Sequence, residues 1–536
     1  MGESGEGEVL LPSSFTVGER VDVQGEKATV KFIGYIKKDE DTKKIVEVEE
    51  GDLWLGLEWD DKERGKHSGE GLFEVGVPGS GSFVKAAKVT RAFTLLQTVE
   101  EKYNDILGNA AEPTDMFVPT AKDNRVGIEL VGRDKAINRY KNLHLLKTVS
   151  LDHSKAGKVG NAEETAEKLK VLEELDVSHS LFSDWMEVEK LGLALPTLRA
   201  LQLNRCRISL PAAFPVEASP LSQLKVIALN RTGLSFKQVC TACTRLPQLE
   251  ALHIANNQLT NLSDAADIVN AALASVKVID MDGNEISEWR EVATLAKLPN
   301  LKKLILSDNK LTDVEAEEGD FAALENLSLS GNKLDDWKCT IPMLHFKHLT
   351  EAKLSRTPMF ESLASSAAHR TGIARIPTLK MLNRSEIGAV QRDEAERFYL
   401  SRWAGGWDRA KAEGEEAKAA FLAEHPTYSK IMARLGEIQV IGTVADGPRT
   451  MMDEVVELNF VSELSEKKHK KKLPPTTGIG AVKALGARLF KLELDNTTFR
   501  YYNEGAEHFP EPLNEDFRTL DYYGIVSGAT VLVEAK

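Results

Sequence analysis

Apolar residues recur in a fixed frame along the middle of the chain. The frame reads L-x-x-L-x-L-x-x-N-x-L, with apolar residues at the leucine positions. Four copies keep the asparagine, and these are Asn257, Asn284, Asn309 and Asn332. Five weaker copies carry another small or polar residue at that position: Ser154, Ser180, Cys206, Thr232 and Thr357. Successive copies are 23 to 27 residues apart, so the spacing indicates a repeat architecture rather than a set of unrelated strands.

This period is typical of leucine-rich repeats. Each copy predicts one short strand, whose leucines point into a core that only the stacking of neighbouring copies completes. The pattern therefore predicts an α/β solenoid over residues 141–403. We expect the asparagine amides to bond backbone groups of neighbouring turns, which would otherwise be buried without partners. A degenerate tenth copy (Ile376, Leu379, Met381) leads into a charged amphipathic helix that ends the array near Trp403.

The segments on either side of the repeats have other patterns. Residues 1–10 predict a flexible N-terminus, and residues 11–92, with short apolar runs broken by Gly and Asp, predict a small β-barrel. Residues 93–140 predict a helix (93–107) and a linker, and residues 404–450 predict a helical cap and linker. Residues 451–536 predict a small α+β domain, with a strand at 454–460, a helix at 479–489 and short strands at 490–494, 499–502 and 530–535.

The run from Lys467 to Lys472 is the most basic segment of the last domain. A block of like charges predicts a solvated loop. A nuclear signal and a surface for an acidic partner are the two alternatives.

Composition restricts the function. The net charge of −14 argues against a nucleic-acid partner, because phosphates require a basic surface. No apolar stretch is long enough to span a membrane, and the N-terminal residues lack the features of a secretion signal. Four cysteines in 536 residues do not make a disulfide framework, as expected in a reducing compartment. We therefore expect a cytoplasmic protein that binds neither nucleic acid nor membrane.

No enzyme motif is present. The sequence contains neither the phosphate-binding G-x-x-x-x-G-K-[ST] nor the zinc-binding H-E-x-x-H pattern. The pair Cys240 and Cys243 lacks a second pair to complete a zinc site, so these residues are expected in the core of a repeat. We expect no catalytic activity, no cofactor and no metal.

The first domain resembles the CAP-Gly family. The resemblance rests on Val17-Gly18, Gly34, the segment WLGLEWD from Trp54, the loop GKHSG from Gly65 to Gly69, and GSFV from Gly81. It implies a groove beside the GKHSG loop that holds C-terminal tails ending in Glu-Glu-Tyr or Phe. Ser68 stands where the family usually has Asp, and the segment between Gly69 and Phe73 is shorter than usual, which predicts a weaker hold on the tail.

The residue types fit such a groove. Glycines allow positive φ and the close approach of a peptide backbone, a lysine supplies a point charge for carboxylates, and aromatic rings form apolar walls. The candidate tail-binding residues are Trp54, Gly65, Lys66, His67, Ser68, Gly69, Phe73 and Phe83. Trp59 is expected in the barrel core. The alternative for the other aromatics is that they, too, only fill the core.

The last domain resembles ubiquitin-like domains, most clearly in FRTLDYYGIVSGATVLVEA. The chain has no terminal Gly-Gly, so conjugation is not expected. A CAP-Gly domain, leucine-rich repeats and a ubiquitin-like domain in this order resemble the tubulin-folding cofactor E family. The resemblance implies a chaperone that holds α-tubulin and takes part, with cofactors B, C and D, in assembling and dissociating the α/β-tubulin dimer.

A cytoskeleton-associated location follows from the same resemblance. The alternative is a microtubule-associated CAP-Gly adaptor that links tubulin to protein quality control.

The concave face of a solenoid is where its partners usually bind. Side chains beside the strand leucines should point there: Asp176, Gln202, Asn204, Asn230, His253, Asp280, Asp282, Ser307, Ser328 and Lys353. Most are small or acidic, which favours a polar protein surface as the partner.

Overall fold

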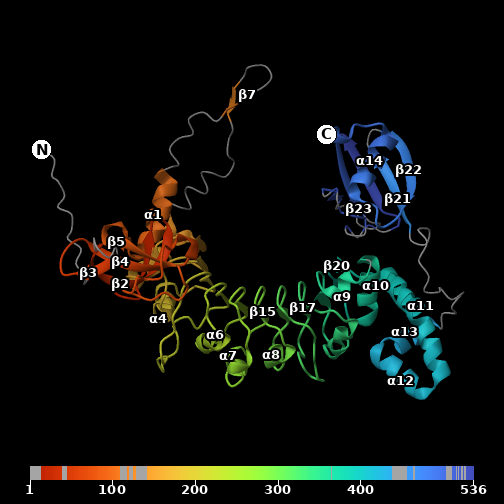
Figure 1. Cartoon of the computed structure of the whole chain (residues 1–536), viewed down its shortest axis with the longest axis horizontal. Helices are drawn as coiled ribbons and strands as arrows, with labels where there is room; N and C mark the ends of the chain where they lie inside the picture. Colours follow the sequence, from red (N-terminus) through yellow and green to blue (C-terminus); the bar gives the residue numbers. More distant parts are fainter. Residues whose placement is uncertain are drawn as a thin grey trace. The chain divides into compact units, whose positions relative to one another are not determined.

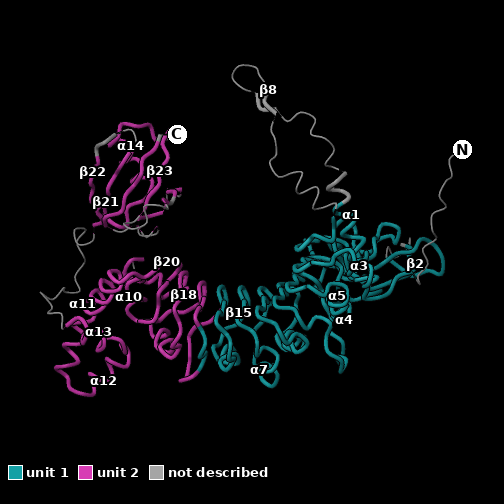
Figure 2. The backbone as a smooth tube through the Cα atoms, turned by 180° about the vertical axis from the view of Figure 1, so that it is seen from behind, with its two compact units in different colours: residues 1–309, 320–324 teal, residues 310–319, 325–536 magenta. Residues whose placement is uncertain are grey.

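The structure is a computed structural model that describes residues 14–38, 45–108, 142–363, 365–436 and most of 455–535, together with two short strands at 117–119 and 125–127. The chain forms two compact units, which Figure 2 colours separately. The first comprises residues 1–309 and 320–324, and the second comprises residues 310–319 and 325–536. Figure 1 labels their elements.

The N-terminal domain, predicted as a small β-barrel, is a five-stranded antiparallel sheet. Its strands are β1 (Arg20–Val23), β2 (Glu26–Lys38), β3 (Ile45–Val48), β4 (Leu53–Trp59) and β5 (Gly81–Lys85), in the order β1-β2-β4-β5 with β3 on β2. Alternate residues of β4 point inward, so Leu53, Leu55, Leu57 and Trp59 are buried together. Trp59 is therefore a core residue, as the sequence indicated.

The chain passes directly from this domain to the solenoid. Strand β6 (Phe93–Thr94) pairs in parallel with β10 (Ala156–Lys158) of the first repeat, and α1 (Leu95–Gly108) follows at once. Leu95 and Val99 are fully buried. Residues 93–103 thus pack against the first repeat. The rest of the predicted linker lies outside the described residues, apart from β7 (Phe117–Pro119) and β8 (Arg125–Gly127), which pair antiparallel.

The repeats of the first unit form parallel strands with short helices on the opposite side (Figure 1). The strands are β9 (Thr148–Ser150), β11 (Glu174–Asp176), β12 (Ala200–Gln202), β13 (Val226–Ala228), β14 (Ala251–His253), β15 (Val278–Asp280) and β16 (Lys303–Ile305). The helices are α3 (Ala162–Lys168), α4 (Trp185–Glu189), α5 (Leu191–Ala194), α6 (Phe236–Cys243), α7 (Val269–Ala272) and α8 (Trp289–Val292). The central residue of every strand is buried, as Leu175 and Leu304 illustrate. The predicted frame is confirmed for these copies.

The asparagine amides bond backbone groups of neighbouring turns, as expected. Asn257 Oδ1 accepts the N–H of Thr232 at 2.8 Å, and the Asn257 amide donates to the Leu229 carbonyl at 2.9 Å. Asn284 repeats the pattern one copy later, where its Oδ1 accepts the N–H of Asn257 at 2.8 Å. Because each buried amide joins two turns, the ladder satisfies backbone groups that no strand reaches. In the weaker copy at Thr232, the hydroxyl donates instead to Leu229 at 3.0 Å.

The second unit holds the later repeats. Strands β17 (Asn326–Ser328), β18 (Glu351–Lys353) and β19 (Met381–Leu382) are parallel, and β20 (Ser385–Glu386) turns back on β19. In the register, Leu327 pairs with Ala352 and Ala352 with Leu382. The inward residue of the tenth copy is therefore Leu382, and the predicted frame at Ile376, Leu379 and Met381 is wrong by three residues. The preceding loop contains α10, which lengthens this copy.

Helices close the array. They are α9 (Pro358–Glu361), α10 (Ser365–Arg375), α11 (Ala389–Glu413), α12 (Glu415–Glu424) and α13 (Tyr428–Leu435). The predicted closing helix is present, but α11 runs unbroken past Trp403, so a boundary between 403 and 404 would cut a helix. Tyr399 and Leu400 of α11 are buried against α10 and α13. The helical segment is thus one packed body from α10 to α13.

The C-terminal domain is a five-stranded mixed sheet with one helix. The elements are β21 (Val456–Ser462), β22 (Ser465–Leu473), α14 (Ile479–Phe490), β23 (Thr497–Tyr502), β24 (Glu511–Pro512) and β25 (Thr530–Ala535). The order β22-β21-β25-β23-β24, with β21 and β25 parallel, is that of a ubiquitin-like fold.

Two local predictions for this domain are wrong. The residues of the basic run that lie within β22 form a strand, not a loop, because they pair with β21. Residues 490–494 form the end of α14 and a turn, since Lys491 takes the left-handed conformation that terminates the helix.

Candidate peptide groove and its mounting on the solenoid

A cluster of aromatic rings covers one face of the N-terminal sheet. Gly56 of β4 lies opposite Phe32 of β2 and Phe83 of β5. A Cβ at Gly56 would lie 2.5 Å from the ring of Phe73, so only glycine lets that ring lie against the strand. Phe83 makes edge contacts with both Phe73 (5.4 Å between centroids) and Phe32 (6.0 Å). Phe32 was missed by the sequence analysis, and its only signal was its position on the same face as Gly34 and Gly56.

The GKHSG loop is fixed beside this cluster. The N–H groups of Lys66 and His67 donate to the Gly81 carbonyl, and the Gly81 N–H donates back to the His67 carbonyl at 2.8 Å. A Cβ at Gly65 would lie 1.9 Å from the Gly79 carbonyl oxygen, and one at Gly69, where φ is +104°, would lie 1.8 Å from that of Phe73. Both glycines are therefore needed for the path of the loop, and this path does not require a ligand.

The side chains of the loop differ in exposure. Lys66 is exposed and has no ion-pair partner among the described residues. His67 lies over the aromatic cluster, 5.0 Å from the Phe83 ring centroid, and its Nδ1 accepts the Gly69 N–H at 3.0 Å. Burial lowers the pKa of His67, and the nearby Lys66 charge adds to this against the opposing effect of Glu70. His67 is thus neutral near pH 7, and Lys66 carries the positive charge of the loop.

The contacts of two further candidate tail-binding residues, Ser68 and Trp54, are also defined. Ser68 Oγ accepts the N–H of Gly79 at 2.9 Å, so the serine still supplies an acceptor to the neighbouring turn. Trp54 lies on the same face of β4 as Gly56, two residues before it, with the Lys85 ammonium 5.6 Å from its ring centroid. The structure therefore brings His67, Phe73 and Phe83 into mutual contact, with Lys66 and Trp54 at the periphery of their cluster.

A buried ion pair of the N-terminal domain lies against the solenoid. Lys27 Nζ lies 2.7 Å from Asp22 Oδ2, and their side chains are 0% and 2% exposed. The same ammonium donates to the backbone carbonyl of His153, in the turn after β9, at 3.3 Å. A lysine is rarely buried so completely, and here it is paired and bonded across the junction.

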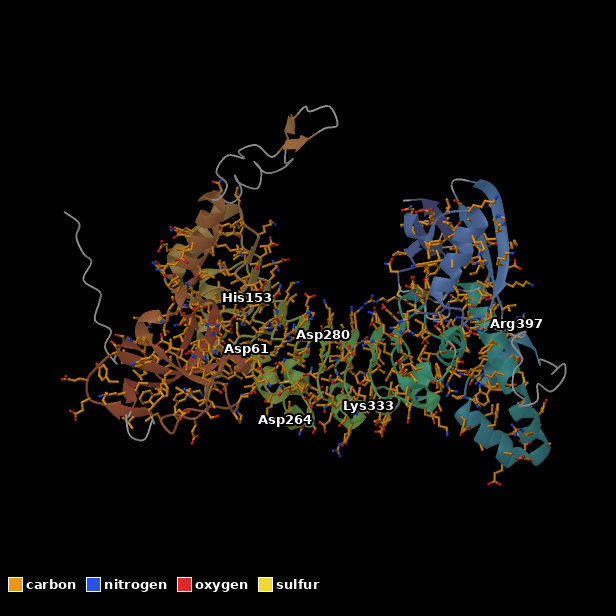
Figure 3. The ribbon with its side chains drawn as sticks, turned by 45° about the horizontal axis from the view of Figure 1, so that its top comes forward. Asp61, His153, Asp264, Asp280, Lys333 and Arg397 are labelled. Atoms are coloured by element: carbon orange, nitrogen blue, oxygen red, sulfur yellow. The ribbon has the colours of Figure 1, made fainter. Side chains whose placement is uncertain are left out.

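A second ionic contact lies next to the loop. Asp60, at the end of β4, accepts two hydrogen bonds from the Arg20 guanidinium, one of them at 2.7 Å, and lies 3.6 Å from Arg207 of the solenoid. The next residue, Asp61, caps the short helical turn that leads into Gly65 (Figure 3). Because Asp22 also exchanges backbone hydrogen bonds with Thr90, shortly before β6, the N-terminal domain is fixed relative to the repeats of the first unit.

The predicted concave residues of the first unit differ in whether their side chains already make hydrogen bonds. Asp176 and Gln202 lie side by side in register at the ends of β11 and β12. His253 and Asp280, on β14 and β15, are 3.2 Å apart, and this hydrogen bond helps to lower the pKa of the aspartate against the opposing effect of burial. Asp280 also accepts the N–H of Asp282 at 3.1 Å.

The amides of Asn204 and Asn230 are already used. Asn204 Oδ1 accepts the N–H of Asn230 at 3.0 Å, and Asn230 Oδ1 accepts the N–H of Ala255 at 2.6 Å. These two side chains are half-buried and join neighbouring turns, which leaves them less available to a partner. Lys353, in the second unit, lies 3.8 Å from Glu351 of the same strand.

An apolar row accompanies the polar one. Ala200, Val226, Ala251 and Val278 lie side by side at the first outward position of four successive strands, and all are half-buried. The sequence does not single out this row, because alanine and valine also occur at inward positions. Charged residues border it. Lys225 and Lys277 both bind Glu250, at 2.7 and 2.8 Å, and lower the pKa of its carboxyl to about 2.

The cysteine pair belongs to the core of a repeat. Cys240 and Cys243 are buried in α6, and burial raises the pKa of both thiols, that of Cys243 to about 12. Over the described ranges, no three His, Cys, Asp or Glu side chains are grouped as metal ligands would be. The described helices include none with the length and apolar character needed to cross a membrane.

The fold defines a multidomain protein with an N-terminal CAP-Gly domain, a leucine-rich-repeat solenoid and a C-terminal ubiquitin-like domain. Residues 17–89 match the family model of the CAP-Gly domain, and residues 299–339 match that of leucine-rich repeats in two copies. A solved structure of the C-terminal ubiquitin-like domain of mouse tubulin-specific chaperone E is 21% identical, covering 17% of this chain and 95% of that chain with a TM-score of 0.16.

Along nearly its whole length the chain is similar to tubulin-folding cofactor E, which is also named tubulin-specific chaperone E. The Arabidopsis thaliana protein of the first name is 28% identical over 546 residues, covering 98% of each chain. Proteins of the second name from Bos taurus and Homo sapiens are each 27% identical, covering 97% and 96% of this chain and 99% and 98% of theirs. The resemblance noted from the motifs therefore extends to the order and extent of all three domains.

Proposed function

We propose that this chain is a tubulin-folding chaperone that binds α-tubulin and acts with tubulin cofactors B, C and D in assembling and dissociating the α/β-tubulin dimer. The observation that carries the proposal is the end-to-end similarity to relatives named for tubulin folding. The role is one of binding rather than catalysis, and it belongs in the cytoplasm, at the cytoskeleton.

The groove supports capture of an acidic C-terminal tail. A tail that ends in an aromatic residue would lay its ring against His67 and Phe83, while its carboxylates approach the exposed Lys66 ammonium. His67, being neutral, would leave Lys66 as the only positive charge that the loop contributes. The salt dependence of tail binding should therefore be shallow.

Binding of the tail and binding of the rest of the tubulin subunit would be coupled, because the N-terminal domain is held rigidly on the solenoid. The chain has no slack between Thr90, which bonds Asp22, and Phe93, which bonds Lys155. A tail held in the groove would therefore bring the client to a fixed position relative to the row from Ala200 to Val278. A rigid mounting of this kind reduces the entropy lost when the second contact forms.

The first experiment tests the groove. Lys66→Glu should weaken binding of an α-tubulin tail peptide at least about tenfold, because attraction to the carboxylates becomes repulsion. The matched control is Lys88→Glu, an exposed lysine of the same domain with the same change in charge. Both variants should keep their stability within about 0.5 kcal/mol. Equal peptide affinity of the two variants would show that the loop does not read the tail.

The second experiment tests the coupling. A fragment lacking residues up to Val89 should still bind free tubulin, but at least about tenfold more weakly than the full chain. A flexible insertion between Arg91 and Ala92 should reduce tubulin affinity while leaving tail-peptide affinity unchanged. If the insertion changes neither affinity, the fixed mounting has no role in client capture.

The adaptor alternative is separated by co-sedimentation. A chaperone should bind free dimer and reduce the amount of polymer, whereas an adaptor should pellet with intact microtubules. Pelleting without loss of polymer would favour the adaptor.

A further inference from the structure

The edge of the C-terminal sheet is strongly basic. Strand β22 is the outermost strand of the sheet, bonded to β21 on one side only. It carries Lys468, Lys470, Lys471 and Lys472, all exposed. The chain as a whole has a net charge of −14, so four exposed lysines within five residues form a local positive strip that the proposed tubulin groove does not explain.

The register assigns three of these lysines to a face of the sheet. Lys470 and Lys472 lie opposite Asn459 and Glu457 of β21, on the face away from α14. Lys471 lies opposite the buried Leu458, on the face that α14 covers. Lys468 lies where the pairing of β22 with β21 is irregular, so the register assigns it to neither face. The strand therefore presents Lys470 and Lys472 on one face and Lys471 on the other.

These charges are largely uncompensated. Lys470 pairs with Glu457 at 3.1 Å. In the described part of the chain, the other three ammonium groups have no acidic partner. Lysines on an edge strand discourage pairing with an identical or apolar strand. The same lysines favour an incoming strand that carries carboxylates, because opposite charges on adjacent strands attract.

We propose that the edge of β22 binds an extended, glutamate-rich peptide of a partner protein, which adds to the sheet as a further strand. The backbone of the peptide would pair with the unpaired N–H and C=O groups of β22. Glutamates two residues apart would then face Lys470 and Lys472, whose spacing matches the two-residue period of a strand. The site is independent of the aromatic groove and does not require a free C-terminus.

The test uses two amidated peptides of about ten residues and equal charge, one of Glu-Ala repeats and one of Glu-Pro repeats. Amidation removes the terminal carboxylate, and neither peptide has an aromatic end for the groove. Fluorescence anisotropy with the full chain should detect the Glu-Ala peptide, with affinity falling as salt rises from about 50 to about 500 mM. The Glu-Pro peptide should bind at least about tenfold more weakly, because proline has no N–H to donate. Equal binding of the two peptides would overturn strand addition.

Variants locate the site. Lys472→Glu should weaken Glu-Ala binding about tenfold, whereas the control Arg488→Glu, an exposed residue of α14 with the same change in charge, should leave it unchanged. Equal effects of the two variants would overturn the proposal, because attraction would then be diffuse. Circular dichroism checks that both variants keep the fold.

The Lys66→Glu variant separates this site from the groove. It should leave binding of the amidated peptide unchanged while it weakens binding of a tubulin tail. Loss of both would assign the peptide to the groove and overturn the edge site, without affecting the proposed chaperone function.

Discussion

The buried pair of Lys27 and Asp22 gives the most direct test of how the N-terminal domain is held on the solenoid. Lys27→Met keeps the length and apolar stem of the side chain but leaves the Asp22 carboxylate buried without its partner, which lies 2.7 Å away in the native chain. Removing one member of a buried ion pair costs about 3–5 kcal/mol. This cost includes the loss of the hydrogen bond that Lys27 donates to the His153 carbonyl.

Amide hydrogen exchange in the full chain measures this cost locally, without assuming that so large a protein unfolds in one step. The amides of β1, β2 and β6 should lose protection, because all three strands meet at the junction. The control is Lys31→Met in the same strand. Lys31 pairs with Glu58 at 2.9 Å but is 34% exposed, and such a pair contributes about 0–1 kcal/mol.

A double variant tests the reason for the effect. Lys27→Met with Asp22→Asn removes both charges and keeps an acceptor for the Gly25 N–H, which donates to Asp22 Oδ1 at 3.1 Å. It should recover most of the lost protection, because the uncompensated charge is gone. If Lys27→Met behaves like Lys31→Met, or if the double variant is as damaged as the single one, the buried pair does not hold the junction.

Two further predictions concern the solenoid and its closing helices. Leu304→Ala should destabilise the first unit by about 2–5 kcal/mol, because the inward residue of β16 is fully buried and leaves a cavity; an unchanged melting curve would refute the register. Burial, helped by the Arg375 charge, lowers the pKa of His425 from its ordinary value to about 4. The unfolded chain therefore takes up the proton first, and the stability of α11 to α13 should be complete above about pH 6.5 and fall towards pH 4, by at most about 1.4 kcal/mol per pH unit. His425→Asn, which offers an acceptor to the Tyr399 hydroxyl in place of Nδ1, should remove that slope in hydrogen exchange measured across this range, and a slope that persists would assign it to other groups.

The aromatic cluster of the N-terminal domain could be predicted only in part from the sequence. The GKHSG loop and the aromatics Phe73 and Phe83 stand out as residue types, and the structure places them together. Phe32 joins the same cluster, but nothing in its own segment distinguishes it from a core residue. Whether a strand residue faces a groove or a core depends on which strands pair with it, and that pairing is a property of the folded sheet.

The sequence by itself determined the elements whose signal is periodic. The leucine frame specified nine inward strand positions, and the asparagine ladder followed from the need to satisfy backbone groups between turns. The frame failed at the tenth copy, where α10 lengthens the repeat and Leu382 replaces the expected residue. Periodicity gives the register only while the length of each copy stays constant.

Only the tertiary structure decided how charged residues are used. Lys27 and His153 are 126 residues apart in the chain, and nothing local to either predicts a contact between them. The run from Lys467 to Lys472 has the composition of a solvated loop, but its pairing with β21 makes it an edge strand. A charged side chain can be solvated, paired or buried, and the free energy that selects among these comes from its neighbours in space.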